Sequence, residues 1–154
     1  MKLTKFKIAV IIGIVLVGLV AWIDIQGFNL LGDKYTQGEF PATVWPHHLI
    51  TAIIIFLIPA LCYFFFYRKD KSEALAIFFS GFIMFYFGLA DILYFWLQGK
   101  SVLEFLPWLN NHIVIGKIAN FINAGVVTNI VLYVSVIIGL ILTYFITKLL
   151  EEKM

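Results

Sequence analysis

Four long apolar runs constrain the fold of this 154-residue chain more than any other feature. They are Phe6–Gln26, His48–Tyr67, Glu73–Leu97 and Ile118–Leu149. A helix of about 20 residues crosses the roughly 30 Å of hydrocarbon in a bilayer, and each run reaches this length. None of the runs alternates polar with apolar residues, which disfavours the strands of a membrane barrel. The sequence therefore predicts an all-α, polytopic membrane protein, folded as an antiparallel bundle of four transmembrane helices.

Composition predicts one membrane domain over residues 1–154. The chain is 62% hydrophobic and only 13% charged, and no polar stretch is long enough for a separate soluble core. A net charge of +2 gives no support for a nucleic-acid partner, so the lipid bilayer is the expected partner. The first run is too long for a secretory signal and lacks a small-residue cleavage site, so we expect a retained span. The lone Cys62 gives neither an intrachain disulfide nor a zinc-binding spacing.

Basic residues predict the orientation, because cytoplasmic segments of membrane proteins are enriched in Lys and Arg. The basic residues expected on one side are Lys2, Lys5, Lys7, Arg68, Lys69, Lys71, Lys148 and Lys153. Those expected on the other side are Lys34, Lys100 and Lys117. We therefore predict a cell-membrane protein with both termini in the cytoplasm and with outer loops over residues 27–47 and 98–117. The tryptophans that map to the outer half, as an aromatic belt, are Trp22, Trp45, Trp96 and Trp108.

The second outer loop contains a helix-start pattern. Ser101 and Glu104 have the spacing of a capping box, in which each residue bonds to the backbone of the other. Apolar residues follow at once, and Pro107 is expected to end the turn. This pattern predicts a short interfacial helix on the outer surface.

Small residues predict how the spans pack. Association of helices in lipid depends on close approach, which small side chains permit. Ala74, Gly81 and Gly88 recur every seven residues in the third run, and Gly13 lies in the first. These positions are expected to face the interior of the bundle.

Asp91 is the most informative polar residue. It lies about two turns from the outer end of the third run and shares a helical stripe with Gly81 and Gly88, so it should face inward. A carboxylate at the centre of a membrane helix costs about 2.5–3.5 kcal/mol, and less toward the interface. One interpretation is an interhelical hydrogen bond, for example to Asn120 or Asn123. The other is a proton, cation or substrate site.

Two histidines begin the second run. Pro46 is a helix-start signal, so His47 and His48 should lie in the first turn of the helix. Consecutive residues point about 100° apart, so only one can face the bundle. His48 shares a face with Thr51, and we predict that it points inward as the acid/base partner of Asp91. The alternative is a pair of ordinary interfacial histidines.

Further polar and aromatic residues map to the same outer half. The candidate pocket residues are Asp24, Asn120, Asn123, Trp96 and Tyr94, and the candidate metal ligands are His47, His48, His112 and Glu104. Each has a structural alternative: Asp24 as a carboxylate reaching the surface, Glu104 as a cap, His112 as a loop residue, and the asparagines as contacts between helices. The inner half is nearly free of ionisable groups apart from the flanking basic residues. The sequence thus predicts a polar site in one leaflet only.

Three functions fit this pattern. The first is binding of, or action on, a lipid-like or quinone-like molecule, with Asp91 and His48 as the reactive pair. The second is a metal or haem site, although the spacing matches no known ligand motif and no cofactor is identified. The third is a non-catalytic subunit of a homo-oligomer or larger membrane complex. A transporter is disfavoured because the sequence shows no repeat and no evident broken-helix pair.

Overall fold

A computed structural model describes the backbone of residues 2–31, 44–68 and 70–152, and the side chains of residues 7–26, 49–67 and 70–152. In chain order its elements are α1 (Lys2–Leu31), α2 (Val44–Cys62), the π-helix η2 (Tyr63–Arg68), α3 (Lys71–Tyr86), α4 (Leu89–Leu97), the 3₁₀ turn η3 (Pro107–Leu109), α5 (Ile115–Ile122) and α6 (Asn129–Glu152). Within the described ranges the regular structure is helical, and one isolated β-bridge joins Phe105 to Thr128. The predicted all-α class is confirmed.

Three helical segments are long and apolar enough to cross a membrane. They are Lys7–Gln26 of α1, Leu49–Tyr67 of α2 and η2, and Asn129–Glu152 of α6. Helices α3 and α4 meet the same criterion when they are taken together, although they are bent by 74°. The described chain therefore has three or four helices of membrane-spanning length, which is consistent with a membrane protein.

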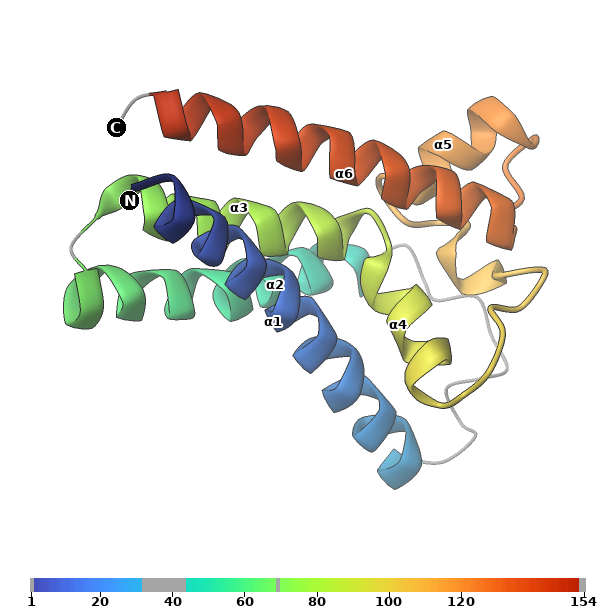
Figure 1. The fold of residues 1–154 in the computed structure, drawn as a ribbon. Helices are drawn as coiled ribbons and strands as arrows, with labels where there is room; N and C mark the ends of the chain where they lie inside the picture. The colour runs from blue at the N-terminus through green and yellow to red at the C-terminus, as the bar shows by residue number, and fades with distance from the viewer. Residues whose placement is uncertain (1, 32–43, 69, 153–154) are drawn as a thin grey trace.

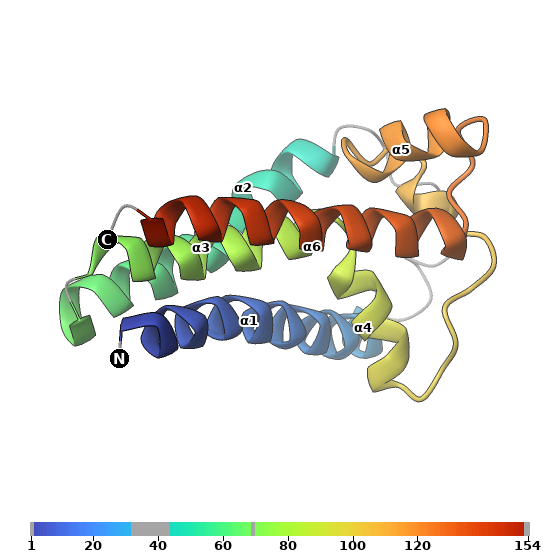
Figure 2. The ribbon, with the colours of Figure 1, turned by 45° about the horizontal axis from the view of Figure 1, so that its top comes forward.

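Helix α3 lies at the centre of the structure and packs against α1, α2 and α6. In Figure 1, α6 and α2 flank α3, and α1 crosses it at an angle. Figure 2 shows the same arrangement from a second direction. In both views one end of the molecule holds the N-terminal end of α1, the C-terminal end of α6 and the start of α3. Helices α4 and α5 lie at the other end.

Two glycines allow α1 and α3 to approach closely. A β-carbon at Gly81 would lie 2.8 Å from the carbonyl oxygen of Gly13, and one at Gly13 would lie 2.9 Å from the Gly81 nitrogen. The buried Ser80 hydroxyl donates to the Ala76 carbonyl of its own helix at 2.6 Å and lies 3.2 Å from the Val10 carbonyl of α1. The inward-facing positions expected for Gly13 and Gly81 are confirmed.

The apolar run Ile118–Leu149 is not one helix. Helix α5 ends at Ile122 and α6 begins at Asn129. Between them Ala124 and Gly125 have positive φ angles of 48° and 88°, and the Gly125 N–H donates to the Ala119 carbonyl at 3.1 Å. Left-handed residues of this kind terminate helices by satisfying the last carbonyls. The predicted fourth span is therefore too long at its N-terminal end, and within this run only α6 has membrane-spanning length.

The capping-box prediction in the second outer loop is wrong. Residues 101–106 are not helical, and the Asn129 N–H donates to the backbone carbonyl of Glu104 at 3.1 Å. The short helical turn η3 begins at Pro107, where the predicted helix was expected to end. The backbone of this segment pairs with the chain entering α6 instead of forming its own helix, so the Glu104 side chain has no capping role.

Candidate functional site

A sharp bend between α3 and α4 positions the candidate site. Gly88, between the two helices, has a φ of +92°. A β-carbon at this position would collide with the Leu132 side chain of α6 and would lie 3.0 Å from Ile115 Cδ1. The sequence suggested no broken helix, but α3 and α4 form one, because Gly88 adopts a conformation that other residues rarely adopt. The bend directs α4 against α1 and places Asp91 in the first turn of α4.

The Asp91 carboxylate meets groups from two other parts of the chain. The Trp108 indole N–H, from the 3₁₀ turn η3, lies within hydrogen-bonding reach of the Asp91 side chain. The Asp24 carboxyl of α1 is close enough to Asp91 to interact with it electrostatically. Asp91 is partly buried, whereas Asp24 is exposed within the isolated chain. Two acids and one N–H donor, from three separate elements, are thus gathered where α1, α4 and η3 meet.

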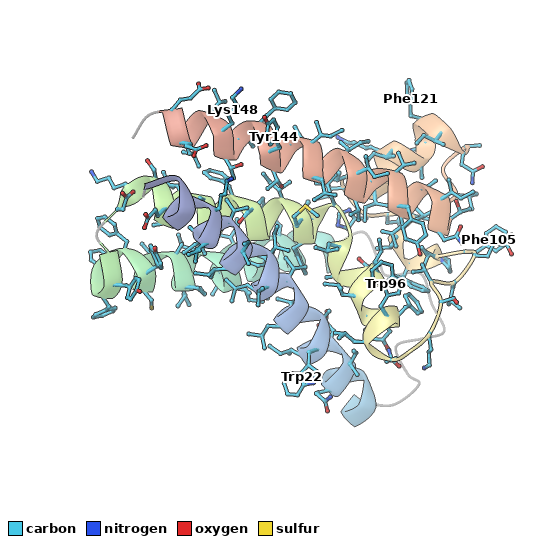
Figure 3. The ribbon with its side chains drawn as sticks, viewed as in Figure 1. Trp22, Trp96, Phe105, Phe121, Tyr144 and Lys148 are labelled. Carbon is cyan, nitrogen blue, oxygen red and sulfur yellow. The ribbon has the colours of Figure 1, made fainter. Side chains whose placement is uncertain are left out.

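Aromatic side chains surround part of this group. The rings of Phe95 and Trp108 lie 6.4 Å apart, and Tyr94 packs edge-on against Phe95 with their ring centroids 5.4 Å apart. Trp96 is exposed on α4, and Trp22 is exposed on α1 (Figure 3). Both predicted pocket aromatics, Tyr94 and Trp96, therefore lie on the same short helix as Asp91. Exposed aromatic residues of this kind can contact either lipid or a ligand.

His112 has a structural role in the described chain. It is 6% exposed, and its Nδ1 accepts hydrogen bonds from the backbone N–H groups of Val114 and Ile115 at 3.2 and 3.1 Å. Its ring centroid lies 5.0 Å from that of Tyr86. A nitrogen that accepts two N–H donors has no lone pair left for a metal. His112 thus stabilises the start of α5 and does not offer Nδ1 as a ligand.

The remaining candidates on this side are spread over several elements. Asn120 and Asn123 are exposed on α5 and its C-terminal turn, and the Asn123 amide donates to the Val126 carbonyl at 3.1 Å. Glu104 is exposed in the loop before η3. These three residues therefore belong to α5 and to the loops beside it and η3, whereas Asp91 belongs to α4.

The side chains of His47 and His48 lie outside the described residues, although the backbone of both is helical near the start of α2. The pairing of His48 with Asp91 therefore stays a prediction. Among the residues whose positions are described, no group of three His, Cys, Asp and Glu side chains is arranged to hold a metal ion.

A buried carboxylate at the opposite end was not predicted. Glu73, in the first turn of α3, is 4% exposed, and its Oε2 accepts a hydrogen bond from the Tyr63 hydroxyl at 2.6 Å. Asp70 caps the same helix, because its Oδ1 accepts from the backbone N–H groups of Ser72 and Glu73. The spacing of Asp70 and Glu73 is a capping signal that the sequence contains. The expectation that buried ionisable groups gather at one end only is therefore wrong.

Comparisons of this chain with protein-family models, with curated proteins and with solved structures find no match. The function is accordingly inferred from the geometry of the chain itself.

Proposed function

We propose that the protein crosses the cell membrane four times in antiparallel order, with both termini in the cytoplasm. The charge distribution supports this topology, since Lys71 and Lys148 belong to the end where α1 begins and α6 ends, and Lys100 and Lys117 belong to the other. The bent pair α3 and α4 is the third span. Its first part, α3, has 16 residues and is about 24 Å long, so α4 completes the crossing near the outer surface.

Helix α5 is the interfacial element in this proposal, in place of the segment first expected. Exposed apolar side chains lie on it and on the neighbouring loop: Phe121 is 94% exposed, Phe105 57% and Ile122 49%. Figure 3 places Phe105 and Phe121 at the end of the molecule remote from Lys148. Exposed aromatic residues on a short amphipathic helix are suited to the boundary between headgroups and acyl chains.

The topology can be tested with single cysteines. In a Cys62→Ser background, Lys153→Cys and Lys100→Cys would be treated in intact cells with a membrane-impermeant maleimide. We expect labelling of residue 100 only, and labelling of both after the membrane is permeabilised. Labelling of residue 153 in intact cells would contradict the proposed orientation.

The proposed activity is binding of a lipid-like or quinone-like molecule whose polar group meets Asp91 and Asp24. The observation that supports it is the gathering of two carboxyl groups and the Trp108 indole from three elements. A carboxylate within the hydrocarbon region of a membrane raises the free energy of insertion unless it is paired or hydrated, so such residues commonly mark functional sites. A hydroxyl or protonated group of a ligand would supply hydrogen bonds that these acids accept.

In this proposal Asp91 has the central role, since it is already oriented by Trp108. It accepts a hydrogen bond or a proton from the ligand, and Asp24 sets the electrostatic potential at the same point. Tyr94 and Trp96 contact the apolar part of the molecule from α4. His48, near the start of α2, remains the proposed second acid/base group.

The experiment compares lipid extracts of the purified protein by mass spectrometry. We expect a lipid-like or quinone-like compound at near-stoichiometric amount in the wild type, and its loss in Asp91→Asn and in Asp24→Asn. Glu104→Gln is the matched control, because it removes an exposed carboxylate of the same outer region without altering the pair. If no compound is retained, or if all three variants retain it equally, the proposed activity is incorrect. Loss of stability in the Asp variants with no bound compound would favour a purely structural role.

A further inference from the structure

A second feature, remote from Asp91, is an apolar groove between α2 and α3. Its volume is about 300 Å³, at the lower end of the roughly 300–1,000 Å³ typical of ligand pockets. The surface that lines it is wholly apolar, and Lys71 contributes only the aliphatic part of its side chain to it. A space of this size and character fits a single hydrocarbon chain better than a whole polar ligand.

The groove exists because small residues from the two helices meet at its floor. Ala60 of α2 and Ala74 of α3 are 4% and 8% exposed, and larger residues form the walls. One wall is fixed by aromatic packing: Phe78 stacks on Phe82 with an interplanar angle of 9° and packs edge-on against Phe79. The α3 wall is therefore held in place by contacts within α3 itself.

The charge at the end of the groove specifies the headgroup. Lys71 is exposed in the first turn of α3, so its ammonium group can reach the headgroup region. The neighbouring carboxylates are already engaged, because Asp70 caps α3 and Glu73 accepts the Tyr63 hydroxyl. In the sequence Arg68 and Lys69 directly precede Asp70, so three basic residues fall within the four positions 68–71. Basic clusters next to a span attract anionic lipids.

We propose that this groove binds one acyl chain of an anionic phospholipid, with the lipid phosphate held by Lys71. In the orientation proposed above, the lipid belongs to the cytoplasmic leaflet. The groove and the Asp24–Asp91 pair lie on different elements, so the two proposals are independent. The occupant is a membrane lipid and not free phosphate, since most of the site is apolar.

The test is native mass spectrometry of the full chain released from detergent micelles, titrated with phosphatidylglycerol or phosphatidylcholine of the same acyl composition. We expect tighter binding of phosphatidylglycerol, and about fivefold weaker binding in Lys71→Gln, which is about 1 kcal/mol for one lysine near the surface. Lys148→Gln is the matched control, because Lys148 is an exposed lysine at the same end that does not line the groove. It should leave the affinity unchanged.

Three results would overturn the proposal. Equal losses in Lys71→Gln and Lys148→Gln would show that overall charge, and not the groove, attracts the lipid. Equal affinity for the two lipids would remove the role of Lys71. Competition by soluble glycerol phosphate would show that the acyl chain contributes nothing. Retention of the Asp91-dependent compound in Lys71→Gln would confirm that the two sites are separate.

Discussion

Substitution of Gly88 by alanine tests the bend on which the candidate site depends. At a φ of +92°, a residue with a β-carbon costs about 1–2 kcal/mol relative to glycine. The new methyl group would also collide with Leu132 and press on Ile115, and overpacking of this kind costs about 1–3 kcal/mol. The lower entropy of the unfolded chain returns about 0.4–1 kcal/mol. We therefore expect Gly88→Ala to lower the free energy of unfolding by about 1–4.5 kcal/mol.

Gly99 provides a matched control for this substitution. It also has a positive φ, of +67°, but a β-carbon there would meet no atom within 4 Å. Gly99→Ala has the backbone cost without the collision, so it should lower the free energy of unfolding by no more than about 1.5 kcal/mol. Both variants can be measured by titration of the protein in mild-detergent micelles with sodium dodecyl sulfate, followed by tryptophan fluorescence. Equal destabilisation of the two would refute the claim that contacts with Leu132 and Ile115 fix the bend.

The same titration tests three further contacts. Gly13→Ala should lower the free energy of unfolding by about 1–3 kcal/mol, because its methyl group would press on the Gly81 backbone. Gly18→Ala is the control: the nearest neighbour of its methyl group would be 4.0 Å away, so the free energy of unfolding should change by no more than about 0.5 kcal/mol. Similar losses in both variants would be inconsistent with close α1–α3 packing. Asp70→Ala should cost about 1 kcal/mol through loss of the α3 cap, with Asp70→Ser restoring most of it. His112→Ala should cost about 1–3 kcal/mol by leaving buried N–H groups without an acceptor, and a neutral result would exclude its role at the start of α5.

The helices of membrane-spanning length were predictable because lipid leaves the backbone few alternatives. Every N–H and C=O group in hydrocarbon needs an internal partner, so a long apolar run is sufficient evidence for a helix. The inward-facing positions of Gly13 and Gly81 followed from residue size alone, whereas their direct contact was not predicted. The break after α5 was also visible in principle, since Asn123, Ala124 and Gly125 form a helix-stop sequence within an apolar run.

The candidate site was predictable only in part. Hydropathy identifies Asp91 as an unusual carboxylate, but its closeness to Trp108 depends on how η3 folds back toward α4. The same limitation applies to Gly88. It was expected only to face the interior of the bundle, but its left-handed backbone conformation also turns the chain between α3 and α4. Periodicity shows which residues share a face of one helix, whereas contacts among three elements depend on the loops that join them.

Two similar capping patterns in this chain have opposite outcomes, and helix length explains the difference. A capping residue contributes about 1 kcal/mol, whereas starting a helix with a nucleation constant near 10⁻³ costs about 4 kcal/mol. After Asp70, α3 continues for 16 residues and packs against three helices, so many later contacts offset that cost. After Ser101, Pro107 removes a backbone donor before a second turn can form, and no such contacts accumulate. The backbone groups of Glu104 and Leu106 instead form hydrogen bonds with Asn129 and Val127, which gives a lower free energy than an isolated helical turn would.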